Sequence, residues 1–116
     1  MKISWKLIST HDSNGNPTSY KSFNETRHSV NYESKGWIKP PPDYNPALFV
    51  FKTRRHARKY RASFPFLKSE TKILKVEIKD EFETFKEVLT NYTLTTAGFP
   101  PGTIFTSALR VIETAR

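Results

Sequence analysis

The sequence predicts one α+β domain with a mixed, mainly antiparallel sheet of four or more strands and two helices packed on it. Three observations lead to this prediction. Apolar and polar side chains alternate in several short segments, as they do in half-buried strands. Two other segments repeat their apolar residues at helical spacing. The 116 residues suit a single core, and no segment resembles a linker, so we expect residues 1–116 to form one domain.

Four segments are predicted to be strands. Residues 3–9 and 74–78 alternate apolar and polar side chains. Residues 48–51 read Leu-Phe-Val-Phe, a continuous apolar run that is typical of a central strand covered on both faces. Residues 103–113 are rich in Ile, Phe, Thr and Val and form the predicted last strand, in which a bulge or burial on both faces would explain the imperfect alternation.

Two segments are predicted to be helices. The first is residues 54–64: the Thr53 side chain can cap its start, and Pro65 stops it at its end. The second, residues 81–92, repeats its apolar residues every three to four positions. Asp80 and Glu83 at its start have the spacing of a capping box, and their charges suit the helix dipole.

The connections carry turn-forming residues. Residues 11–46 are predicted to be a long irregular loop with room for short strands, and Asn14-Gly15 within it suits a tight hairpin bend. Prolines 40–42 are expected to be extended. Pro101-Gly102 suits the centre of a type II turn, in which glycine supplies the positive φ.

Composition excludes several kinds of chemistry. The chain has no Cys, which rules out disulfides, thiolate metal ligands and cysteine nucleophiles. The three His match no metal motif, and there is no P-loop, dinucleotide-binding glycine pattern or nucleophile elbow. We therefore expect no cofactor, no metal and no catalytic residue. One enzyme hypothesis stays open, a site between the 11–46 loop and the sheet that uses His28 and Tyr32.

No apolar run has the length of a signal peptide or of a membrane-spanning helix. The sequence therefore predicts a cytoplasmic protein without membrane insertion, and it leaves the oligomeric state open.

Charge provides the sharpest functional feature. The net charge is +8, from 19 basic and 11 acidic residues, which favours an anionic partner. Six of the basic residues fall in one short stretch without an acid, and on a helix most of them would lie opposite the apolar stripe. They are Lys52, Arg54, Arg55, Arg58, Lys59 and Arg61. These side chains are predicted to bind nucleic acid or an acidic protein; otherwise they form a solvated face or pair with loop acids such as Glu33 and Asp43.

A second predicted surface is aromatic. Five aromatic residues lie among the polar residues and prolines of the long loop: Tyr20, Phe23, Tyr32, Trp37 and Tyr44. Exposed rings of this kind can stack on unpaired bases or anchor a protein interface. The alternative is that they fold back and cover the sheet.

The chain also resembles small uncharacterised proteins of phages and other viruses, mainly over the stretch from about Leu48 to Glu113. The resemblance lies in the order of short motifs: Gly36-Trp37, Leu48-Phe49-Val50-Phe51, Ala57-x-x-Tyr60, Lys75-Val76-Glu77, Pro101-Gly102-Thr103 and Leu109-Arg110-Val111-Ile112-Glu113. It implies a viral or phage accessory protein that binds a host macromolecule. The sequence therefore predicts a small basic binding module that contacts nucleic acid through the arginine-rich helix, with an inhibitor of an acidic host protein as the alternative.

Overall fold

The structure is a computed structural model that describes residues 2–11, 17–22, 32, 36–40, 47–63, 71–88 and 90–113. Its elements, in chain order, are β1 (Lys2–His11), β2 (Pro17–Ser22), β3 (Leu48–Phe51), α1 (Arg54–Ala62), β4 (Thr71–Ile78), β5 (Thr84–Lys86), β6 (Thr93–Thr95), the 3-10 helix η2 (Thr96–Gly98), β7 (Thr103–Thr106) and β8 (Leu109–Glu113).

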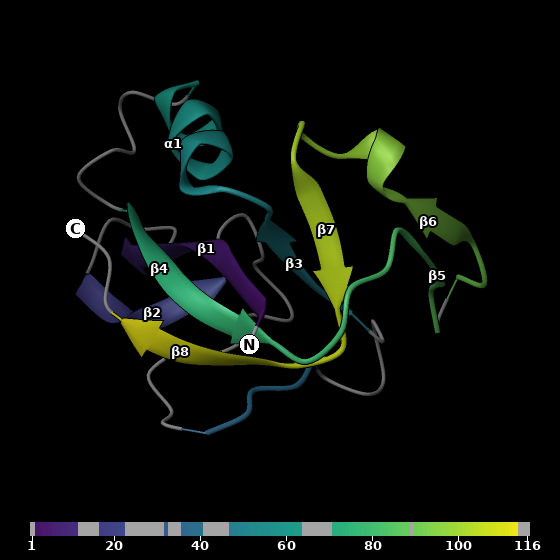
Figure 1. Ribbon diagram of the computed structural model, residues 1–116, viewed down its shortest axis with the longest axis horizontal. Coiled ribbons are helices and arrows are strands. Elements are labelled where there is room, and N and C mark those ends of the chain that lie inside the picture. Colours follow the sequence, from purple (N-terminus) through teal and green to yellow (C-terminus); the bar gives the residue numbers. More distant parts are fainter. Residues whose placement is uncertain are drawn as a thin grey trace.

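Six strands form the main sheet (Figure 1). Its order is β7-β3-β1-β4-β8, and β2 pairs with β1; β5 and β6 form a separate two-stranded sheet. Every strand pairing in the described part of the chain is antiparallel. The predicted strands at 3–9, 48–51 and 74–78 are confirmed, and β3 is an internal strand as expected. Strand β2 lies inside the region 11–46 that was predicted to be irregular.

The sheet bends back on itself because of how β7 and β8 are connected. They occupy opposite ends of the strand order, yet only Ser107 and Ala108 separate them in the chain. Two strands so linked must meet at a corner, and Figure 1 shows them leaving that corner in different directions. The prediction of one continuous strand over 103–113 is therefore wrong. The corner is fixed by Asp80, whose carboxylate accepts hydrogen bonds from the Ser107 N–H at 2.7 Å and the Ser107 hydroxyl at 2.6 Å.

The main core lies on the inner face of this bent sheet. Its members come from β1, β3, β4, β7 and β8 and from two residues between β2 and β3: Ile8, Tyr32, Ile38, Leu48, Val50, Leu74, Val76, Ile78, Ile104 and Leu109. Burial of such side chains contributes about 1.5–3 kcal/mol each. The core therefore joins both ends of the sheet into one unit.

Two polar residues of β1 share this inner face. Ser4 and Lys6 lie opposite the core residues Val76 and Leu74 in the β1–β4 register, and both are buried. The Lys6 ammonium donates a hydrogen bond of 2.7 Å to the carbonyl of Phe49. The alternation in β1 is therefore real, but its polar members face inward, while the outer face is covered in part by α1.

The first predicted helix is confirmed as α1. Thr53 is its N-cap, and its hydroxyl oxygen accepts a hydrogen bond of 3.1 Å from the His56 N–H. The helix packs on the outer face of the sheet through Ala57 and Tyr60, which belong to a cluster with Leu7, Phe51, Ile73 and Trp5. The helical wheel predicts an apolar stripe of Ala57, Tyr60 and Phe64. Ala57 and Tyr60 form the packed face as predicted, and Phe64 lies outside the described residues.

The second predicted helix, residues 81–92, is wrong. Phe82 forms a backbone bridge to Phe105 of β7, and Phe85 is buried between two exposed neighbours in β5. Asn91 has a φ of 63°, a left-handed conformation that turns the chain toward β6. The fold is broadly α+β. The described residues contain one α-helix, not the two that were predicted, and this helix packs on a mainly antiparallel sheet. A third apolar cluster, which includes Phe49, Phe85, Phe99 and Phe105, packs the β5–β6 hairpin against β3 and β7.

The helices in the described part of the chain lack the length or the apolar character needed to cross a bilayer.

Candidate anion-binding site

The site is built on α1, which starts and ends with capped backbone groups. After the Thr53 cap, the helix continues to Ala62, and the Ser63 N–H donates a hydrogen bond of 3.0 Å to the Tyr60 carbonyl. The first turn holds Arg54 and Arg55 and no acid. The helix dipole places partial positive charge at that same end. The N-terminal half of α1 is therefore strongly electropositive.

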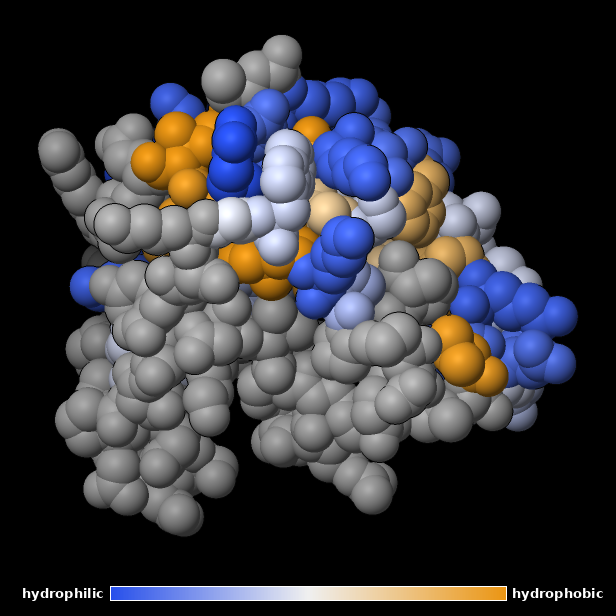
Figure 2. Space-filling model, turned by 90° about the horizontal axis from the view of Figure 1, so that it is seen from below, coloured by the Kyte–Doolittle hydropathy of each residue, from blue (hydrophilic) through white to orange (hydrophobic). Residues whose placement is uncertain are grey.

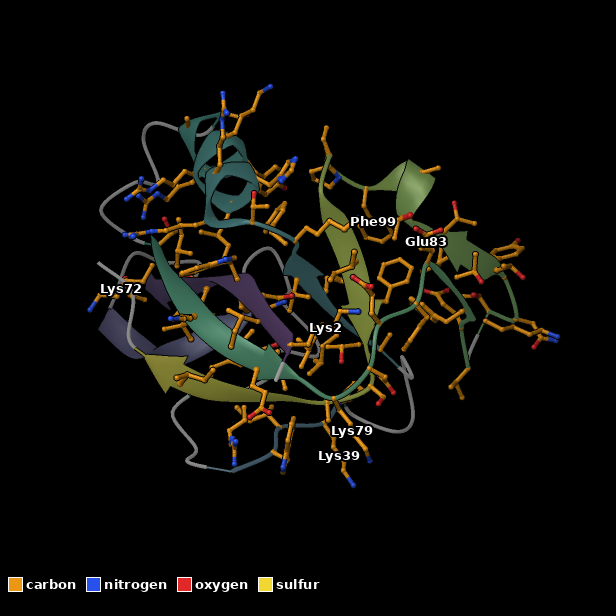
Figure 3. The ribbon with its side chains drawn as sticks, viewed as in Figure 1. Lys2, Lys39, Lys72, Lys79, Glu83 and Phe99 are labelled. Atoms are coloured by element: carbon orange, nitrogen blue, oxygen red, sulfur yellow. The ribbon has the colours of Figure 1, made fainter. Side chains whose placement is uncertain are left out.

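Three cations of α1 point into solvent. Arg55, Arg58 and Lys59 are exposed, and Figure 3 shows nitrogen-tipped side chains extending from α1 away from the sheet. Within the described residues, the ion pairs join Lys2 to Glu81 and Arg110 to Glu77, and neither involves the helix. The exposed face of α1 thus carries positive charge that no described acid neutralises. Glu33 and Asp43, named above as alternative partners, lie outside the described residues.

The other predicted cations have different roles. Arg54 is half-buried, with its guanidinium carbon 5.7 Å from the centre of the Trp5 ring and its Nε buried without a hydrogen-bond partner. The helical wheel places Arg54 with the other cations on the side opposite the apolar stripe, and its half-buried position corrects that prediction. Arg61 is also half-buried. Lys52 is exposed just before the helix, and its backbone N–H donates to the carbonyl of Gly102 at 2.8 Å.

A cleft of about 400 Å³ lies between α1 and the turn that precedes β7. Its lining combines cations, an imidazole, a phenol, a hydroxyl and two proline rings: Arg55, His56, Lys59, Tyr60, Ser63, Pro100 and Pro101. Sequence reasoning found Arg55 and Lys59 but missed the other five as parts of one site. The helix and the turn are about 40 residues apart in the chain, so no local sequence pattern predicts that they lie side by side.

The turn is held against the helix by backbone geometry. Gly102 has a φ of +85°, which confirms the predicted positive φ. A Cβ at this position would lie 2.6 Å from Cδ2 and 2.7 Å from Cβ of His56, so the turn approaches the helix as closely as a glycine permits. The Thr103 hydroxyl donates to the Pro100 carbonyl at 2.7 Å. His56, whose Nδ1 lies 2.7 Å from the Thr53 hydroxyl oxygen, is thus fixed on both sides.

The predicted aromatic surface is only partly described. Tyr32 is 1% exposed and belongs to the main core, so it does not serve as a surface contact. Trp37 is 45% exposed, and the Arg110 guanidinium carbon lies 5.2 Å from its ring centre. The Tyr20 side chain and all of Phe23 and Tyr44 lie outside the described residues, as does His28 of the enzyme hypothesis.

The described part of the face away from α1 has a mixed character. Figure 2 views the molecule from below, and in its coloured part hydrophobic residues form small separate patches among hydrophilic ones. Within the described residues, no three His, Asp or Glu side chains form a group that could hold a metal ion.

No family model, curated protein or solved structure matches this chain. The function is therefore argued from the chemistry of the site.

Proposed function

We propose that the protein is a small basic binding module that contacts nucleic acid through α1. The observation that carries this proposal is the exposed set Arg55, Arg58 and Lys59, which has no counter-charge among the described residues. Arg55 lies three and four positions before the other two, where like charges on a helix repel each other by about 0.2–0.5 kcal/mol per pair. A bound anion would replace this repulsion with attraction.

A polyphosphate chain suits this surface better than an isolated anion. It offers regularly spaced charges to several cations at once, and each guanidinium can grip a phosphate through two parallel hydrogen bonds. The net charge of +8 adds a long-range attraction for any polyanion. Release of counterions from the nucleic acid would then supply much of the binding free energy.

The test is a pair of charge reversals with a matched control. We expect Arg55→Glu with Arg58→Glu to weaken binding to a labelled oligonucleotide by roughly 10- to 100-fold, and to lower the slope of log affinity against log salt by about 2. The control reverses Lys39 and Lys79, which lie at the end of the molecule opposite α1 in Figure 3 and are exposed. It makes the same change in net charge and should alter affinity by less than about fivefold.

Fluorescence anisotropy at several salt concentrations measures both quantities. Equal losses in the two double variants would show that binding depends on total charge and has no defined contact on α1. If the unmodified protein binds no nucleic acid even at low salt, the proposal is wrong.

A further inference from the structure

The two walls of the cleft beside α1 differ in chemistry. Arg55 and Lys59 line it from the helix, one turn apart, while Pro100 and Pro101 form the opposite wall. Cations suit phosphate oxygens. The proline rings and the Tyr60 ring are largely apolar, so this part of the lining suits an apolar or aromatic group. A phosphate backbone by itself would leave this apolar part of the cleft unused.

The cleft is also preformed. The turn is fixed by the close approach of Gly102 to His56 and by the hydrogen bond between Lys52 and Gly102. The Tyr60 ring lies 5.6 Å from the Phe51 ring, between centres, so the sheet supports it. A volume of about 400 Å³ falls in the range of about 300–1,000 Å³ that is usual for clefts that bind small ligands. The turn and the Tyr60 ring therefore need little ordering when a ligand enters.

We propose that this cleft receives one unpaired base of a single-stranded nucleic acid, while Arg55 and Lys59 bind the phosphates on either side of that base. The inference rests on the proposed function and adds the class of nucleic acid. A base in a duplex is paired and stacked, so it reaches such a cleft only after it is flipped out. Flipping requires the free energy of unpairing and unstacking, which is small or absent for a base in a single strand. The protein should therefore prefer single strands.

The experiment closes the cleft without changing any charge. Ser63 is exposed, lines the cleft and has ordinary helical backbone angles, so Ser63→Trp places an indole in the space meant for the base. Ala62 is the exposed neighbour that does not line the cleft, and Ala62→Trp is the matched control. The probes are an oligothymidylate and an oligouridylate of about 12 nucleotides, and a DNA duplex of about the same length.

We expect Ser63→Trp to weaken binding to one or both single strands by about 5- to 150-fold, the usual worth of one stacked base, and to leave duplex binding within about twofold. Ala62→Trp should leave all three affinities within about twofold. The thymidylate and uridylate arms show whether the strand is DNA or RNA. Equal single-strand and duplex affinities in the unmodified protein, with no selective loss in Ser63→Trp, would overturn the inference and leave the proposed function standing.

A second measurement needs no variant. In the unmodified protein, amide NMR signals of Ser63 and Gly102 should shift more when the single strand is added than when the duplex is added, because the duplex contacts only the cations of α1. If neither signal responds to the bound single strand, the cleft is not the base site.

Discussion

Gly102 illustrates at the scale of one residue how the cleft keeps its shape. We predict that Gly102→Ala lowers the free energy of unfolding by about 2–4 kcal/mol, because the methyl group adds backbone strain at a φ of +85° and overlaps His56. Urea unfolding measures the change.

Gly98→Ala is the control, since a Cβ there meets nothing within 4 Å. It should leave stability unchanged or raise it slightly. Adding His56→Ala to Gly102→Ala should restore part of the loss. His56→Ala removes the ring but keeps Cβ, which would lie 2.7 Å from the new methyl group. If the double variant is no more stable than Gly102→Ala alone, overlap with the His56 ring is not the cause.

Arg54 shows why a helical wheel assigns some charged residues incorrectly. The wheel places a side chain by its angle around the helix axis, but a long arginine can fold back over a neighbouring ring. Trp5, on the outer face of β1, supplies that ring. The charge reversals proposed above therefore use Arg55 and Arg58, which are exposed, and leave Arg54 in place.

At the scale of elements, the β5–β6 hairpin depends on its phenylalanine contacts. Phe85 packs against Phe105 with ring centres 4.9 Å apart, and its neighbours Thr84 and Lys86 are exposed. We predict that Phe85→Ala destabilises the protein by about 3 kcal/mol and speeds amide hydrogen exchange in the hairpin. Exchange in the β1–β4 pairing should change only through the overall loss of stability.

The amides of Glu87 and Asn91, both hydrogen-bonded within the hairpin, report the local effect. Val88→Ala is a suitable control, because this side chain is exposed on the same hairpin. A uniform increase in exchange throughout the molecule would show that the hairpin does not open as a separate unit.

At the scale of the whole molecule, closure of the bent sheet depends on the corner between β7 and β8. Asp80 holds that corner through Ser107 and also accepts a hydrogen bond of 3.1 Å from the Thr106 hydroxyl. Burial acts to raise the pKa of Asp80, but the hydrogen bonds from Ser107 and Thr106 and the charge of Lys79 together bring it below its ordinary value of 3.8. The charged form is thus favoured by folding.

This lowered pKa gives stability a pH dependence of defined sign. The contribution of the charged Asp80 to the free energy of unfolding is present above the pKa of 3.8 in the unfolded chain. It is lost as pH falls through the lower pKa of the folded protein. Asp80 is itself exposed, so solvent screening reduces the contribution of its charge. We predict that Asp80→Asn destabilises the protein by less than about 1 kcal/mol near neutral pH, and that the difference from the unmodified protein shrinks as pH falls below about 4. Urea unfolding across this pH range measures it. Glu81→Gln, which removes an exposed ion pair with Lys2, should have a much smaller effect. A difference that is constant with pH would mean that the Asp80 charge is not involved.

The sequence alone determined the features that depend on neighbouring residues. Alternation located β1 and β4, the continuous apolar run Leu48–Phe51 located β3, the Thr53 cap and the wheel located α1, and Pro101-Gly102 located the turn with positive φ. The cations of the site were found for the same reason, since they follow one another on one helix.

Only the tertiary structure decided how distant segments meet. Phe82 and Phe85 have helical spacing, but both rings pack on Phe105, and this contact keeps residues 84–86 in a strand. Asp80 bonds to the corner at Ser107 and does not cap a helix. The cleft exists because the Pro100-Pro101 turn reaches α1. Hydrogen bonds and apolar contacts between residues far apart in the chain determine the strand at 84–86, the corner at Ser107 and the cleft. The spacing of residues within one segment does not predict such contacts.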